Sequence, residues 1–290
     1  MLRNLRNLKR NSIHRLYRYF PKAVLSNKGF SHYLFRSTPL YSQKNKLVVF
    51  WNGKAGCSFI SKWFFFQCGL LEEALSYSSW IHDYRTQVFT KKDHYISNLS
   101  DALFDKSVTK IKLVRNPFAR AVSAYFAVNT YYKDNRRFDP FHAVERDKIF
   151  KFLNRKADAD FSFREFVSFL TSNDQIDSHF IKQTHQLEKT DVFTLHKILK
   201  LENISEDLTE LENEMKLKSS SHLNLRSSSH NIEYSENTLE FCGDKIYPFR
   251  RSQDVTIPPY KYFYDKSIQE KIFQLYKEDF INYNYPKDLK

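Results

Sequence analysis

The chain has 290 residues, of which 41% are hydrophobic and 17% aromatic, enough to bury one sizeable core or two small ones. Its three cysteines form no CxxC pair and no Cys/His spacing suited to zinc, which argues against a disulfide framework and a structural metal and favours a reducing compartment. No apolar run approaches the roughly 18 residues of a membrane span.

The net charge of +13 is concentrated near the amino terminus. Residues 1–71 contain 13 of the 46 Lys and Arg residues and no acid, so the remaining 33 are balanced by the 33 Asp and Glu of the rest of the chain. A local excess of this kind predicts a basic arm and a local anion site rather than a coat for nucleic acid.

Residues 2–20 have Leu, Ile and Phe at helical spacing among arginines and lysines, and Pro21 closes the run. This pattern predicts a basic amphipathic helix within an arm at residues 1–40, followed by a single domain at 41–290. Such a helix suits peripheral contact with an anionic membrane, contact with a polyanionic substrate, a presequence, or packing against the domain.

Two units of strand, loop and helix follow. Lys46–Trp51 is an apolar run rich in strand formers, a glycine-containing break comes next, and Cys57–Gln67 continues without Gly or Pro. Lys110–Val114 repeats the pattern, with Asn116 as the expected N-cap and Pro117 as the first residue of the next helix. This order predicts an α/β fold with a central parallel sheet flanked by helices.

Shorter elements are expected farther along. Residues 218–266 lack clear periodicity and are interpreted as a loop-rich insertion near a functional edge. The remaining predictions are a helix after a capping box of Ser162 and Glu165, a strand at Ile198–Leu201, a helix capped by Ser205 and running to Leu217, and a helix over Ser267–Asn282.

The first strand-to-helix loop is a candidate anion site. Gly53 and Gly56 flank Lys54, so backbone N–H groups can converge on an anion at the start of the helix, with Lys54 and Ser58 as side-chain donors. The order of lysine and glycine differs from the Walker A motif GxxxxGK[ST], which disfavours an ordinary ATPase or kinase. The alternative is a tight turn with a solvated lysine.

The second junction offers a similar pair of groups. Arg115 follows the strand and Ser123 falls in the second turn of the next helix, where both side chains are expected to reach an anion at the carboxyl edge of the sheet. A guanidinium holds phosphate through two hydrogen bonds, and the hydroxyl adds a third donor. The alternative is an arginine that caps local carbonyls and a buried helix serine.

The two segments together resemble the 5′-phosphosulfate loop and the 3′-phosphate motif of PAPS-dependent sulfotransferases. Gly53 to Ser58 (GKAGCS) is similar to the P-K-V-A/G-C-T loop of the carbohydrate sulfotransferase branch, with glycine in place of proline. Val114 to Tyr125 (VRNPFARAVSAY) matches the second motif, V-R-(D/N)-P-F-x-R-L-(V/I)-S-A-(Y/F), almost throughout. Weaker similarity recurs at residues 177–183, 201–208 and 276–280, so that the resemblance spans about residues 46–285 without a counterpart for 218–266.

The resemblance implies a P-loop-like three-layer fold and transfer of a sulfuryl group from PAPS to a hydroxyl of a carbohydrate acceptor, with release of PAP and no metal. It places the 5′-phosphosulfate on the loop that contains Lys54 and Ser58, and the 3′-phosphate on Arg115 and Ser123. Lys54 is then catalytic as well as binding. The other loop residues of the site are Ala55, Gly56 and Cys57.

An acceptor hydroxyl also needs a base, and the resemblance directs the search to a histidine between the two motifs. His82 is the candidate, with Asp83 or another carboxylate to orient its ring and His94 as the reserve. His179 and Gln183 are candidate contacts to the acceptor, and His179 is equally suited to a packed structural role.

Two other functional classes stay open on the residues alone. A nucleotide- or polyanion-binding module of the same fold, without chemistry, is suggested by Gly53 in place of the motif's proline, by the lack of a motif that fixes the base, and by the basic arm. An RNA-binding protein is disfavoured by the balanced charge after residue 71 and by the lack of an RNA motif. Without a membrane span, a cytoplasmic enzyme is expected, with peripheral membrane contact through residues 2–20.

Overall fold

The computed structural model describes residues 38–131, 140–156, 160–173, 177, 179–191, 193–225, 233–234, 240–247, 250–251 and 256–289. They divide into two compact units, one from Met1–Val114 and Thr184–Arg226 and the other from Arg115–Gln183 and Ser227–Lys290, and each is described by itself. The predicted helix at 2–20 lies outside the described residues. None of the helices in these ranges combines the length and apolar character needed to cross a bilayer.

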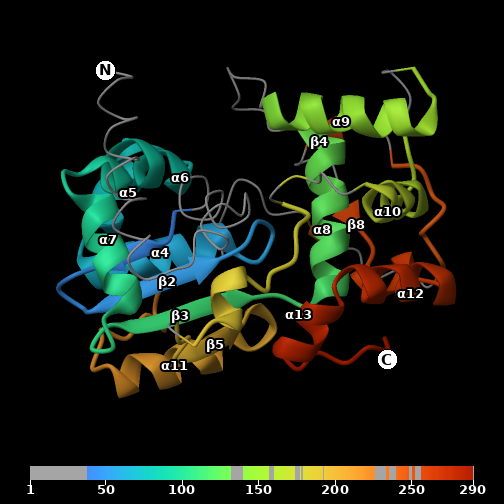
Figure 1. The fold of residues 1–290 in the computed structure, drawn as a ribbon. Helices are drawn as coiled ribbons and strands as arrows, with labels where there is room; N and C mark the ends of the chain where they lie inside the picture. The colour runs from blue at the N-terminus through green and yellow to red at the C-terminus, as the bar shows by residue number, and fades with distance from the viewer. Residues whose placement is uncertain are drawn as a thin grey trace. The chain divides into compact units, whose positions relative to one another are not determined.

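The first unit is built on a four-stranded sheet in the order β1-β2-β3-β5 (Figure 1). The strand β1 (Leu40–Ser42) is antiparallel to β2 (Leu47–Trp51), whereas β3 (Thr109–Val114) is parallel to both β2 and β5 (Lys197–Lys200). Every residue of β2 is buried, as expected for a strand covered on both faces. The predicted α/β class, with helices around a largely parallel sheet, is confirmed.

Helices fill the connections of this sheet, including the polar segment between the two predicted strand-to-helix units. The last helix begins at Ile204, not after Ser205, because Asn203 occupies the N-cap position and no side chain caps the helix. The helical elements are α4 (Cys57–Cys68), α5 (Leu71–Tyr77), α6 (Ile81–Asp83), the π-helix η1 (Tyr84–Val88), the 3₁₀ turn η2 (Phe89–Lys91), α7 (Tyr95–Phe104), η3 (Gln186–Lys189), η4 (Leu201–Asn203) and α11 (Ile204–Glu214).

A buried polar network anchors the second half of α4. The Trp63 indole N–H donates to Glu212 Oε1 at 2.8 Å, and Ser220 Oγ donates to the same oxygen at 2.6 Å. The Gln67 side chain donates to Lys218 O at 2.8 Å and accepts from Lys218 N at 3.1 Å. Since a satisfied buried network fixes the side chains that form it, α4 is held against α11 and the chain that follows.

The second unit is mainly helical, with two small parallel ladders, β4 with β7 and β6 with β8. Its core is rich in aromatic side chains, many packed edge to face, among them Phe118, Tyr125, Phe163 and Phe263. The elements are α8 (Pro117–Asn129), β4 (Thr130–Tyr131), α9 (Pro140–Leu153), α10 (Phe163–Ser172), β6 (Glu233–Tyr234), β7 (Arg250–Arg251), β8 (Thr256–Ile257), η6 (Tyr260–Phe263), α12 (Lys266–Leu275) and α13 (Lys277–Asn282).

Two details differ from the sequence prediction. The expected helix over 267–282 is two helices, separated at Tyr276, whose hydroxyl donates to Phe180 O at 2.6 Å. The described parts of the expected insertion at 218–266 contain three two-residue strands and a 3₁₀ turn, and residues 218–225 belong to the first unit. At Tyr276 the break between the helices coincides with a contact to a residue 96 positions away.

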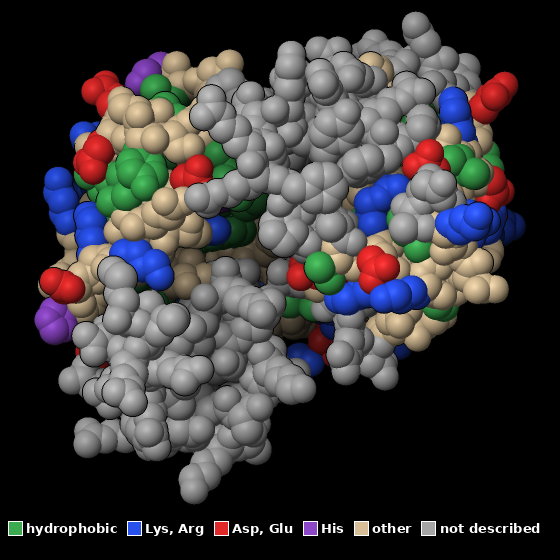
Figure 2. Space-filling model, turned by 90° about the horizontal axis from the view of Figure 1, so that it is seen from above, with side chains coloured by type: hydrophobic (Ala, Val, Ile, Leu, Met, Phe, Trp, Pro, Cys, Tyr) green, Lys and Arg blue, Asp and Glu red, His purple; other side chains and the backbone are tan. Residues whose placement is uncertain are grey.

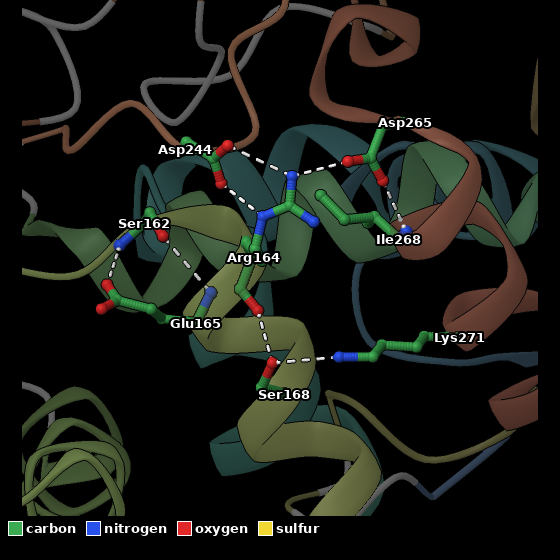
Figure 3. A network of polar contacts seen from close by, with 8 residues as sticks. All are labelled: Ser162, Arg164, Glu165, Ser168, Asp244, Asp265, Ile268 and Lys271. Carbon is green, nitrogen blue, oxygen red and sulfur yellow. Dashed lines mark hydrogen bonds and ion pairs between the residues drawn. The ribbon is translucent and has the colours of Figure 1, made fainter.

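Arg164 connects three segments of the second unit (Figure 3). The predicted capping box before it is confirmed, because Ser162 Oγ accepts from Glu165 N and Glu165 Oε2 accepts from Ser162 N. The Arg164 guanidinium pairs with Asp244 and, at 2.6 Å, with Asp265, which caps α12 by accepting from Ile268 N at 2.8 Å. One cation thus joins α10 to the 240–247 segment and to the start of α12.

Asp265 makes the free energy of unfolding of this unit depend on pH. Partial burial by itself raises its pKa, but the hydrogen bonds from Arg164 and the Ile268 N–H outweigh that effect and bring the pKa of Asp265 below its ordinary value of 3.8. A depressed carboxylate pKa contributes stability above the unfolded-state pKa, and this contribution is lost as the pH falls through the folded-state value.

We expect Asp265→Asn to lower the free energy of unfolding by about 1 kcal/mol at pH 7, because the amide still caps α12 but no longer pairs with Arg164. Asp265→Ala should cost about 1 kcal/mol more, since the cap is lost as well. Urea unfolding of both variants between pH 7 and pH 2 measures these free energies. The difference in free energy of unfolding between wild type and Asp265→Asn should vanish at pH 2. A difference that persists at pH 2 would contradict the ion-pair account.

Candidate functional site

The predicted anion loop forms a tight turn between β2 and α4. Two of its residues have left-handed backbone conformations, Lys54 with φ 67° and Gly56 with φ 87°, and Ala55 N donates to Asn52 O at 3.2 Å. Helix α4 then starts at Cys57 with no side-chain cap and no acidic residue in its first turn. The positive end of the helix dipole and its first N–H groups are therefore disposed to bind an anion.

A side chain at Gly56 would meet close neighbours as well as an unfavourable backbone conformation. A Cβ atom at this position would lie 2.8 Å from Leu201 Cδ1 and 3.1 Å from Leu113 Cδ2. Leu113 lies near the end of β3 and Leu201 in the turn after β5, so the loop lies directly against neighbouring parts of the sheet. A side chain here would have to displace both leucines or lift the loop.

Gly69, at the other end of α4, gives a matched comparison, because its φ of 72° is also left-handed but nothing lies within 4 Å of its Cβ position. We expect Gly69→Ala to cost about 1 kcal/mol from backbone strain alone and Gly56→Ala about 2–3 kcal/mol, since overpacking adds to strain. Urea denaturation of the two variants measures the difference, and equal costs would show that the leucine contacts do not matter.

In the structure His82 lies next to the candidate anion loop. Its ring is buried on α6, and Nε2 lies 3.1 Å from Ser58 Oγ, with the direction of the proton set by the tautomer. Thr86 Oγ1 donates to His82 O at 2.8 Å, which fixes the backbone at this turn. His94, the reserve candidate, is exposed before α7 with φ 59°, and no contact of its ring with the loop occurs among the described residues.

Asp83 does not contact the His82 ring within the described part of the chain. Its Oδ2 accepts from Ser78 Oγ at 2.9 Å and its Oδ1 from Gln87 Nε2 at 3.2 Å. Asp83 thus organises the turn that presents His82 and does not orient the imidazole directly.

Arg85 is a feature that the sequence analysis missed. It lies in the π-helix after His82, and its guanidinium carbon is 5.0 Å from the centre of the Trp51 ring at the end of β2. Burial lowers the pKa of Arg85, and its buried Nε has no hydrogen-bond partner among the described residues. A π-helix often marks a functional position, but its i→i+5 bonding has no sequence signature that periodicity reveals.

The second predicted segment begins the second unit, where Gln183 fixes the backbone of Arg115. The Gln183 side chain donates to Arg115 O at 2.8 Å and accepts from Arg115 N at 2.9 Å, and Gln183 N donates to Asp279 Oδ2 at 2.7 Å. Gln183 is fully buried. Its expected contact with an acceptor is therefore wrong, because the amide is used to hold the arginine.

The predicted start of helix α8 is confirmed, and two side chains in this segment differ from the others in their solvent access. Asn116 Oδ1 accepts from Phe118 N at 2.9 Å, with Pro117 as the first helical residue. From 115 to 129 every residue is buried except Arg115 and Ser123. The two residues expected to hold a 3′-phosphate are thus the two in this stretch that keep solvent access.

Arg120, the other arginine of the motif, has a structural position. It is 2% exposed, and its guanidinium donates to Ile181 O at 2.8 Å and to His179 O at 3.1 Å. Burial lowers its pKa. The His179 ring lies 2.7 Å from Asp177 Oδ1 through Nδ1 and is partly exposed, so it stays a candidate for acceptor contact.

Comparison with known proteins agrees with these features. Residues 39–286 match the family model described as the sulfotransferase family. A match over most of the chain shows that the protein belongs to this family, so it is a transferase for sulfuryl groups. Searches among curated proteins and among solved structures returned no match.

Each unit by itself offers groups that suit an anion. The first unit offers the start of α4, the Lys54 ammonium and the Ser58 hydroxyl, and the second unit offers the accessible Arg115 and Ser123. Cationic and N–H donors of this kind suit phosphate and sulfate oxygens. The described residues contain no cluster of His, Cys, Asp or Glu that is suited to hold a metal ion.

Proposed function

We propose that the protein transfers the sulfuryl group of PAPS to a hydroxyl of a carbohydrate acceptor and releases PAP. Family membership supports the transfer, and the observation that carries the mechanism is the 3.1 Å contact between His82 Nε2 and Ser58 Oγ. It joins the candidate base to the candidate donor loop, although 24 residues separate them in sequence.

The donor is proposed to use both motifs. Lys54, Ser58 and the N–H groups of Ala55 to Ser58 would hold the 5′-phosphosulfate, and Arg115 and Ser123 the 3′-phosphate. Each motif follows the carboxyl end of a strand in the same sheet, because Trp51 at the end of β2 pairs with Leu113 of β3 and Arg115 comes two residues after Leu113 in the chain. Open α/β sheets bind ligands at this carboxyl edge.

The bound donor would supply an activated sulfuryl group, and the protein's residues would supply the rest of the catalysis. The Lys54 ammonium stabilises negative charge that develops on the leaving phosphate oxygen. His82 accepts the proton of the attacking hydroxyl, and Ser58 positions the imidazole by hydrogen bonding to Nε2 when no acceptor is present. The carbohydrate class of the acceptor rests on the similarity of Val114 to Tyr125 to the carbohydrate branch.

Calorimetric binding of PAP at fixed salt tests the donor site. We expect wild type to bind PAP, and Arg115→Ala to lose at least tenfold in affinity at unchanged stability, because a bidentate phosphate contact contributes about 1.5–3 kcal/mol.

Arg120→Ala is the matched control for that substitution. It should lower the free energy of unfolding by about 2–4 kcal/mol, because Ile181 O and His179 O lose the buried guanidinium that donates to them. Failure of wild type to bind PAP would overturn the proposed function. Binding of PAP without turnover of PAPS on any hydroxyl acceptor would instead favour a nucleotide-binding module without chemistry.

His82→Ala should reduce kcat by a factor of about 10²–10⁴ while PAP binding stays close to that of wild type, because a general base acts on the acceptor proton and not on the nucleotide. His94→Ala, at the exposed histidine before α7, should leave kcat unchanged. Release of PAP during turnover provides the measurement. Equal losses in the two variants would argue against His82 as the base.

A further inference from the structure

Trp80 differs from the other tryptophans of the chain in its exposure. Trp51 and Trp63 are 4% and 0% exposed, whereas Trp80 is 44% exposed. It lies immediately before α6, and the end of α5 adds a second exposed aromatic side chain, Tyr77. Figure 2 views the face that carries α5 and α6, where hydrophobic side chains reach the surface among charged and polar ones. A lone exposed apolar residue is common, so the position of Trp80 has to carry the argument.

The backbone holds Trp80 in a closed turn. Trp80 N donates to Ser78 Oγ at 3.1 Å, and Trp80 O accepts from Asp83 N at 2.8 Å. Ser78 Oγ in turn donates to Asp83 Oδ2 at 2.9 Å. Trp80 therefore belongs to a hydrogen-bonded turn, and its indole is exposed from that turn and not from a loose loop end.

The same turn places the indole next to the candidate base. The Trp80 and His82 rings meet edge to face, with their centres 5.4 Å apart, and His82 Nε2 is 3.1 Å from Ser58 Oγ. A continuous line of contacts thus runs from an exposed indole through the imidazole to the donor loop, entirely within the first unit. A ligand that covers the indole would therefore lie beside His82, the candidate base for the proton of the ligand's hydroxyl.

We propose that Trp80 is the platform on which a sugar ring of the acceptor stacks, so that one of its hydroxyls is presented to His82. The inference rests on the proposed function and adds the acceptor subsite. A pyranose ring has an apolar face of C–H groups and a rim of hydroxyls, which matches a flat indole bordered by polar groups. Stacking on one face leaves the rim hydroxyls free to approach the imidazole.

Acceptor kinetics test the platform. With the oligosaccharide that wild type sulfates best, chosen from a panel of neutral, amino-sugar and uronic-acid oligosaccharides, Trp80→Ala should raise the acceptor KM about tenfold. Trp80→Phe, which keeps a flat ring, should recover most of this loss, and PAP binding should stay unchanged in both. Leu75→Ala, at a similarly exposed apolar residue of α5, is the control and should leave the KM unchanged.

Fluorescence provides an independent measurement, because Trp80 is the exposed member of three tryptophans and we expect it to account for most of the quenching by acrylamide. Saturation with the same oligosaccharide should protect the emission of wild type, and Trp80→Phe should show little quenching with or without it.

The possible failures are distinguishable. If wild type does not bind PAP, the proposed function fails and the platform fails with it. If PAP binds and a saccharide is sulfated, but Trp80→Ala has the KM of wild type and Trp80 is not protected, the platform alone is overturned. If PAP binds and no saccharide of the panel is sulfated, the platform is overturned as well.

Discussion

The left-handed turn at Gly56 is the constraint on which the first unit's candidate site depends. The chain turns there with the methyl groups of Leu201 and Leu113 close to the Cβ position, and α4 begins one residue later, beside the end of β3 and the turn after β5. That position sets Ser58 in the first turn of α4, where its hydroxyl meets His82. The buried contacts of Trp63 and Gln67 hold the rest of the helix, so the loop is fixed from both sides.

The elements that the sequence predicted well are those in which local chemistry and burial agree. The apolar runs at Lys46–Trp51 and Lys110–Val114 form β2 and β3, and Asn116 with Pro117 starts α8 as capping preferences require. The capping box of Ser162 and Glu165 is another signal of this local kind.

Two of the predictions that failed depended on partners distant in sequence. The helix break at Tyr276 accompanies a hydroxyl that reaches Phe180 O, 96 residues away. Gln183 was expected at the acceptor, but its amide pairs with the backbone of Arg115, 68 residues away. No periodicity or propensity encodes these contacts, and the roles assigned to Lys54, His82, Arg115 and Ser123 stay predictions until they are measured.

The nearly complete burial of α8 changes how a match to its sequence should be weighed. Between Arg115 and Asn129, thirteen of fifteen positions are buried, so the side chains there are chosen largely by packing, and Arg120 by the two carbonyls it must satisfy. Similarity along this segment therefore identifies a fold much more strongly than it identifies a reaction. A relative that had lost its chemistry would keep almost the whole motif, and the informative positions for telling the two apart are Arg115 and Ser123.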